Sequence, residues 1–134
     1  MFTLTTTIHL HDTDAAGRLY FAHLFRLAHE GYEAWMKALG FSIGDILKGQ
    51  RYALPIVRAE ADYRLPLCVG DEVTLDLRAT RVGASSFTLC CRLRKNGQLA
   101  GQVITVHVAV SAKKGGKVPL PARLRNALIN AGRA

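Results

Sequence analysis

The apolar residues change their spacing once along this chain, and that change constrains the fold more than any other feature. From about residues 19–23 to Leu39 they recur every three or four positions, as on one face of a helix. Gly40 then follows as a typical C-cap. From Ala53 onward they recur at every second position, as in strands with one buried face. One amphipathic helix followed by several half-buried strands predicts an α+β domain.

The apolar stripe of the expected helix is narrow, because several of its members are small. It comprises Leu24, Leu27, Ala28, Gly31, Ala34, Trp35, Ala38 and Leu39. The pairs Arg26–Glu30 and Glu33–Lys37 lie on the opposite face, four residues apart, where they support a solvent-exposed side. A narrow stripe lets another layer approach closely, so we expect a sheet that wraps this helix.

Strands are expected on both sides of the helix. They cover residues 2–10, 53–65, 72–80, 87–94 and 98–112, and short helical segments are expected at 41–49 and 119–131. Asn96-Gly97 is the favoured pair for a tight hairpin turn. The order β-α-β-β-β-β, with three hairpin-like links, indicates an antiparallel sheet. Dimerisation is a reasonable way to cover its open edges.

Size and composition exclude several classes of protein. The 134 residues, 49% of them hydrophobic, suffice for a single packed domain over residues 1–134. No apolar run is long enough for a membrane span, and residues 1–10 lack the features of a secretory signal. The cysteines, Cys68, Cys90 and Cys91, are odd in number and form no disulfide framework. We therefore expect reduced thiols and a cytoplasmic location.

The formal net charge of +8 predicts attraction to phosphate groups, but charge alone does not identify their source. The aromatic residues do not alternate with the basic ones, as a stacking platform for nucleic acid requires. We therefore expect no nucleic-acid partner. The five histidines form no convincing ligand set, so no metal and no other cofactor is expected.

Two acids, Asp12 and Asp14, precede the helix in a short polar segment that contains Gly17. Their spacing alone favours a helix cap or a turn. The other interpretation is functional, because the free amides of a helix start can hold a carbonyl oxygen as it gains negative charge. A carboxylate beside such an oxyanion site is the minimum for acyl transfer.

The element order, with Asp-x-Asp-x-x-Gly ahead of the helix, resembles the hotdog fold and, within it, the 4-hydroxybenzoyl-CoA thioesterase family. The resemblance extends from about Thr5 to Arg123 and implies a five-stranded antiparallel sheet wrapped around one long helix. Four segments are similar to the 1,4-dihydroxy-2-naphthoyl-CoA thioesterases of phylloquinone and menaquinone biosynthesis. These segments are residues 12–17, 29–35, 53–57 and 118–121.

The resemblance also assigns roles to individual residues. Asp14 falls on the catalytic carboxylate of the family, and the oxyanion site falls at the helix start, near Gly17 and Phe21. The implied substrate pocket contains Tyr20, His23, Pro55 and Val57, and the implied CoA-binding residues are Arg81, Ser85 and Ser86. His23 departs from the pattern, because the family commonly has Asn there, and this change alters the polarity of the helix entrance.

A thioester suits a single carboxylate, because its thiol has a pKa of about 8.5 and can leave as thiolate without a general acid. Asp14 either attacks the carbonyl carbon to give a mixed anhydride or deprotonates a water. The expected function is hydrolysis of an aromatic acyl-CoA, with 1,4-dihydroxy-2-naphthoyl-CoA favoured. Other aromatic or short-chain acyl-CoAs, and a non-catalytic acyl-CoA-binding hotdog protein, are the alternatives. The resemblance further implies a homo-oligomer, a dimer or a tetramer, with active sites at the subunit boundary.

Overall fold

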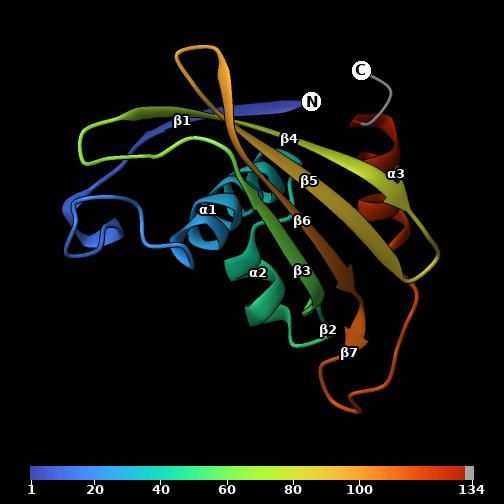
Figure 1. Ribbon diagram of the computed structural model, residues 1–134. Coiled ribbons are helices and arrows are strands. Elements are labelled where there is room, and N and C mark those ends of the chain that lie inside the picture. Colours follow the sequence, from blue (N-terminus) through green and yellow to red (C-terminus); the bar gives the residue numbers. More distant parts are fainter. Residues whose placement is uncertain (132–134) are drawn as a thin grey trace.

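The computed structural model describes residues 1–131 and shows one antiparallel sheet with helices packed against it (Figure 1). The strand order is β1-β4-β5-β6-β3. The strands are β1 (Phe2–Thr7), β3 (Ile56–Tyr63), β4 (Glu72–Val82), β5 (Ser86–Lys95) and β6 (Gln98–Val108). The mixed α+β architecture expected from the sequence is confirmed.

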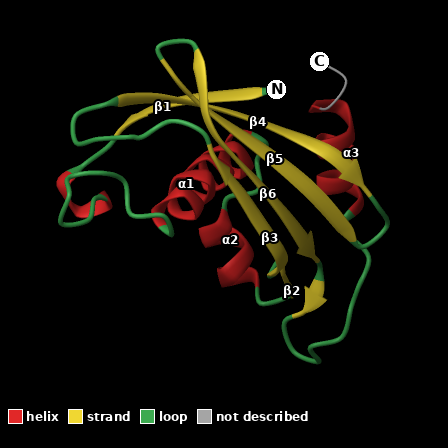
Figure 2. Ribbon diagram, viewed as in Figure 1, coloured by secondary structure: helices red, strands yellow, loops and turns green. Residues whose placement is uncertain are grey.

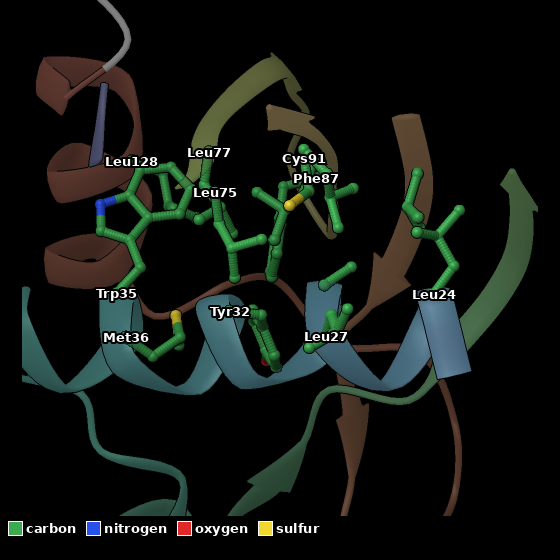
Figure 3. Close-up of a cluster of buried hydrophobic side chains, with 14 of the residues drawn as sticks. Leu24, Leu27, Tyr32, Trp35, Met36, Leu75, Leu77, Phe87, Cys91 and Leu128 are labelled. Atoms are coloured by element: carbon green, nitrogen blue, oxygen red, sulfur yellow. The ribbon is translucent and has the colours of Figure 1, made fainter. Parts of the chain in front are cut away.

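Three helices accompany the sheet, of which α1 (His23–Ala38) is the longest. The others are α2 (Ile43–Gly49) and α3 (Ala122–Ala131), and a 3-10 turn covers Leu10–Asp12. Leu124 and Leu128 of α3 join Trp35 of α1 and Leu75 of β4 in one buried cluster, so both helices pack on the same side of the sheet (Figures 2 and 3). Within residues 1–131, every helix is too short or too polar to span a lipid bilayer.

Helix α1 buries a broader face than its narrow stripe predicts. Tyr32 and Met36 are buried as well, whereas Ala38 is exposed. The sheet curves around the helix, so residues beside the stripe also meet apolar partners. At Gly31 the helix lies close to β4, because a Cβ there would lie 2.8 Å from Cδ1 of Leu77. Gly40, with a φ of +91°, ends the helix as expected.

The link between β3 and β4 is not a hairpin, contrary to the sequence-based expectation. β3 pairs with β6, and β4 pairs with β1, so residues 64–71 cross from one edge of the sheet toward the other. Local alternation identifies strands but does not say which strands pair. The two later hairpins are confirmed, and Asn96 and Gly97 adopt the positive φ angles, +51° and +77°, of their tight turn.

Two of the expected strands are interrupted. The segment expected at 53–65 divides into β2 (Tyr52–Ala53) and β3, with Pro55 between them. Proline has no N–H to donate and therefore disfavours a continuous ladder at that point. The segment expected at 98–112 divides into β6 and β7 (Val110–Ser111), and β7 pairs with β2 in a small second sheet.

Candidate active site

The loop before α1 presents the Asp14 carboxylate on a tight turn. Oδ1 of Asp14 accepts hydrogen bonds from the backbone N–H groups of Ala16 and Arg18, at 2.8 and 3.4 Å. The N–H of Gly17 donates to the carbonyl oxygen of Asp14 at 3.0 Å, and Gly17 has a φ of +78°. Gly17 therefore shapes the turn that holds Asp14. Its amide is already used, which corrects the expectation that it serves the oxyanion site.

The start of α1 has no side-chain cap. Its N-cap is Ala22, and neither Asp12 nor Asp14 reaches it, so the cap interpretation is wrong for this helix. Within residues 1–131, the backbone amides of Phe21 and Ala22 donate to no protein acceptor. Phe21 is 62% exposed, so this residue lies at the surface of the loop. An uncapped helix start with free amides is suited to hold a carbonyl oxygen that becomes negative.

Asp12 serves a different purpose from Asp14, because its side chain is fully buried. Its Oδ2 accepts the N–H of His9 at 2.9 Å, and its Oδ1 lies 2.7 Å from Nη2 of Arg26. Burial opposes ionisation of Asp12, but the His9 amide and the charge of Arg26 outweigh it and lower the pKa of this carboxyl. Asp12 is thus an ionised group that fastens the loop to α1.

His23 opens α1 and is tied to the same loop. Its Nδ1 lies 3.0 Å from the carbonyl oxygen of Asp12 and must carry the hydrogen there, because a carbonyl only accepts. Nε2 is then left as an acceptor. The Tyr20 ring lies against His23 edge to face, with centroids 5.5 Å apart. The structure thus brings together four of the predicted site residues, Asp14, Tyr20, Phe21 and His23, in one loop and helix start.

Tyr63 on β3 was not identified from the sequence. Its hydroxyl donates a hydrogen bond to the carbonyl oxygen of Phe21, and burial raises the pKa of this phenol. This contact fixes the backbone next to the free Phe21 amide. The partners are 42 positions apart in the chain, so only the fold could reveal them. Tyr63 also borders a cleft beside the loop, together with two basic residues, Arg18 and Arg64.

A cavity of about 290 Å³ lies between α1 and the sheet. Most of its wall is apolar and comes from α1, β3 and the central strands, and its polar members include Thr105 and His107. His107 is buried, and its ring lies within hydrogen-bond distance of the Thr105 hydroxyl. Burial lowers its pKa to about 4, so it is neutral at pH 7.

The remaining predicted site residues lie at the other end of the sheet (Figure 1). Pro55 and Val57 flank the start of β3, whereas Tyr63, at its end, contacts the helix start. Arg81, Ser85 and Ser86 lie at the β4–β5 turn, and Ser86 pairs with Val108 near Pro55. Within one chain, therefore, the structure does not bring these residues to Asp14.

One cluster of side chains has the composition of a metal site. His9, His11 and Asp12 place ligand atoms within 4.8 Å of one another. The guanidinium of Arg26 already neutralises Asp12. A divalent cation there would meet this positive charge, so the cluster gives no reason to revise the expectation of a reaction without metal.

Comparisons with known proteins agree with this geometry. The family model of the thioesterase-like superfamily matches residues 8–128. The 1,4-dihydroxy-2-naphthoyl-CoA hydrolase of Synechococcus elongatus is 39% identical over 116 residues, which cover 86% of this chain and 85% of that protein. The hydrolase of the same name from Synechocystis is 32% identical over 133 residues, which cover 96% and 95%.

The architecture has a close counterpart among solved structures. The crystal structure of a 1,4-dihydroxy-2-naphthoyl-CoA thioesterase from Synechocystis matches with a TM-score of 0.91 and 30% sequence identity, over 96% of each chain. The resemblance carried by the Asp motif and the element order is thereby confirmed, since both the family match and the structural match cover almost the whole described chain. The chain belongs to the thioesterase-like superfamily.

Proposed function

We propose that this protein hydrolyses an aromatic acyl-CoA, with 1,4-dihydroxy-2-naphthoyl-CoA as its favoured substrate. The observation that carries the proposal is the Asp14 carboxylate on a loop that leads to an uncapped helix start. Relatives that act on this substrate, at up to 39% identity, support the choice of acyl group. A protein that only binds a polyanionic CoA thioester gains nothing from a carboxylate in that position.

The free amide of Phe21 donates to the thioester oxygen and stabilises it as the carbonyl carbon becomes tetrahedral. Such a donor typically lowers the barrier by about 3–4 kcal/mol. In one route, Asp14 takes a proton from water while the water oxygen bonds to the carbonyl carbon, and the C–S bond then breaks. In the other, an Asp14 oxygen bonds to that carbon, thiolate leaves, and water cleaves the resulting anhydride. Both routes end in free acid and CoA.

The free edge strand supports a homodimer. Seven of the eight residues of β3 are exposed, and Val57 is 61% exposed although it is apolar. An open edge strand presents unpaired N–H and C=O groups with which another strand can pair. Two copies of β3 that pair antiparallel around a two-fold axis would extend the sheet across both subunits and cover this edge. Such a dimer is compatible with further assembly to a tetramer.

The same pairing completes the active site. With the axis near the middle of β3, at Ala59 or Glu60, the start of the partner's β3 lies beside Tyr63, which contacts the helix start through Phe21. The N–H of Val108 donates to the carbonyl oxygen of Pro55 at 3.1 Å, and Val108 pairs with Ser86. The pocket and CoA-binding residues predicted from the sequence therefore approach the loop of the other subunit together.

A panel of CoA thioesters tests the proposal through the rate at which free CoA appears. We expect kcat/KM to fall from 1,4-dihydroxy-2-naphthoyl-CoA to benzoyl-CoA to acetyl-CoA, because a mostly apolar cavity lined by Phe25 and Tyr32 favours an aromatic bicyclic group. A tenfold preference for medium-chain aliphatic groups would overturn the choice of substrate. Absence of turnover on every thioester would overturn the enzymatic assignment.

The three free cysteines support the expected cytoplasmic location.

A further inference from the structure

The cavity under α1 is mostly apolar, with Arg26 and His29 among its lining residues on the helix and a polar end at Thr105 and His107 on the sheet. Oγ1 of Thr105 lies 3.0 Å from Nε2 of His107, and Nδ1 of His107 lies 3.4 Å from the carbonyl oxygen of Leu54. The rings of Phe87 and Tyr32 pack against His107, with centroids 4.8 and 4.5 Å away. The polar pair is thus held in place by apolar neighbours and by the backbone.

The hydrogen bonds at this end fix which atoms donate. Because the carbonyl oxygen of Leu54 only accepts, Nδ1 of neutral His107 carries the ring hydrogen, and Nε2 accepts. Thr105 must then donate its hydroxyl hydrogen to Nε2. Its oxygen retains lone pairs on the side of the cavity, which Thr105 lines. The polar end therefore offers a hydrogen-bond acceptor, and a ligand that binds there must supply the hydrogen-bond donor.

The cavity extends to the free edge of the sheet, where Ile56 and Ala59 border it and are exposed. In the proposed dimer, the partner's Tyr63 lies beside Ile56, and Ile56 pairs with His107. Two strand spacings, about 10 Å, then separate the backbone of the partner's Tyr63 from that of His107. Because the hydroxyl of Tyr63 contacts Phe21 at its own helix start, an acyl group whose thioester lies at one subunit can extend its ring toward the cavity of the other.

We propose that Thr105 recognises a ring hydroxyl of the acyl group, and that His107 is a positioning residue which orients Thr105; the inference rests on the proposed function. In 1,4-dihydroxy-2-naphthoyl-CoA, the 1-hydroxyl is next to the thioester carbonyl and bonds to it internally. The 4-hydroxyl points away from the thioester and is free to donate. It is the group that meets the oxygen of Thr105.

The test compares two substrates that differ only in this group, 1,4-dihydroxy-2-naphthoyl-CoA and 1-hydroxy-2-naphthoyl-CoA. Thr105→Val keeps the shape of the side chain and removes the acceptor. We expect the ratio of the two kcat/KM values to fall about fivefold to tenfold in this variant, as for loss of one uncharged hydrogen bond. The matched control is Thr88→Val on β5, whose side chain points away from the cavity because its neighbour Leu89 lines it. The control should keep the wild-type ratio.

His107→Leu tests the positioning role. Without Nε2, the hydroxyl of Thr105 is free to turn, so the substrate ratio should fall in the same direction as in Thr105→Val. The double variant should show no further fall, because both changes remove the same interaction. A His107 that only supports the core would lower both rates equally and leave the ratio unchanged.

The outcomes separate this inference from the proposed function. A wild-type enzyme that hydrolyses both thioesters, with a ratio unaffected by Thr105→Val, would overturn the recognition of the hydroxyl and leave the thioesterase in place. A wild-type protein that hydrolyses neither thioester would overturn both. A lower ratio in Thr105→Val and His107→Leu, with the control unchanged, supports the inference.

Discussion

Arg26 on the first turn of α1 places Nη2 2.7 Å from Oδ1 of Asp12, a fully buried carboxylate two residues before Asp14. The two acids of the motif therefore have different roles. Asp12 fastens the loop to the helix from inside, whereas Asp14 remains exposed on the turn. Exchanging each acid for its amide should separate a structural effect from a chemical one.

Asp12→Asn should destabilise the fold at neutral pH. The amide keeps the shape and can accept the His9 N–H, but it loses the charge that pairs with Arg26. We expect a loss of about 1–3 kcal/mol, the usual cost of leaving buried polar groups without proper partners. Urea unfolding measures it, with Asp14→Asn as the matched control, expected within about 0.5 kcal/mol of wild type. Equal losses in the two variants would contradict the division of roles.

The stability of the wild type should also depend on Asp12 in acid. Its folded pKa lies below the ordinary value of 3.8, so ionised Asp12 contributes stability above about pH 4 and loses it as pH falls through the folded pKa. Between pH 5 and pH 3, the wild type should therefore lose more stability than Asp12→Asn. Some acid sensitivity should remain in the variant, because Asp71 and Asp76 keep their partners Lys95 and Arg94. If the unfolding free energies of wild type and Asp12→Asn fell in parallel with pH, Asp12 would not contribute to the acid sensitivity.

The close contact between Gly31 of α1 and Leu77 of β4 gives a test of the packing. Gly31→Ala would place a Cβ 2.8 Å from Leu77, and we expect a loss of about 1–2 kcal/mol as the layers separate. Gly44→Ala is the matched control, because open space surrounds that position in α2. It should gain up to about 1 kcal/mol from helix propensity. If thermal unfolding showed that both variants are more stable than wild type, α1 would lie farther from the sheet than it does in this structure.

Local patterns in the sequence predicted the local structure well. The stripe of α1, its end at Gly40 and the Asn96-Gly97 turn all depend on neighbours within a few residues. The pairing of β3 with β6 depends on contacts between residues about 40 to 50 positions apart, and the alternation of apolar and polar residues within a strand does not predict it. Pro55 marks the break between β2 and β3, but the apolar pattern on both sides of it predicts one continuous strand.

The candidate site was only partly predictable for the same reason. The Asp motif identified Asp14, and the family resemblance identified the helix start. Burial of Asp12, by contrast, depends on Arg26, which the sequence suggested only as the partner of Glu30 on an exposed face. Tyr63 and Thr105 come from strands whose place beside α1 follows from the sheet order. Spacing along the chain contains no signal for either of them.

Val57→Glu tests the proposed edge pairing. The side chain is already 61% exposed in the single chain, so the substitution should leave its fold intact. Charges of one sign would then face each other across the two-fold axis, and the dimer should dissociate with loss of turnover. Light scattering and CoA release measure both effects. Thr5→Glu, on the opposite edge strand β1, is the matched control. A Val57→Glu protein that stays dimeric and fully active would refute this interface.

The most direct measurement is the steady-state rate of CoA release from 1,4-dihydroxy-2-naphthoyl-CoA by wild type and Asp14→Asn. The amide keeps the shape of the side chain but has neither the nucleophilicity nor the basicity of the carboxylate. The account predicts that nearly all turnover is lost, while unfolding stability and binding of the thioester stay close to wild type. An Asp14→Asn protein that retains wild-type turnover would contradict it.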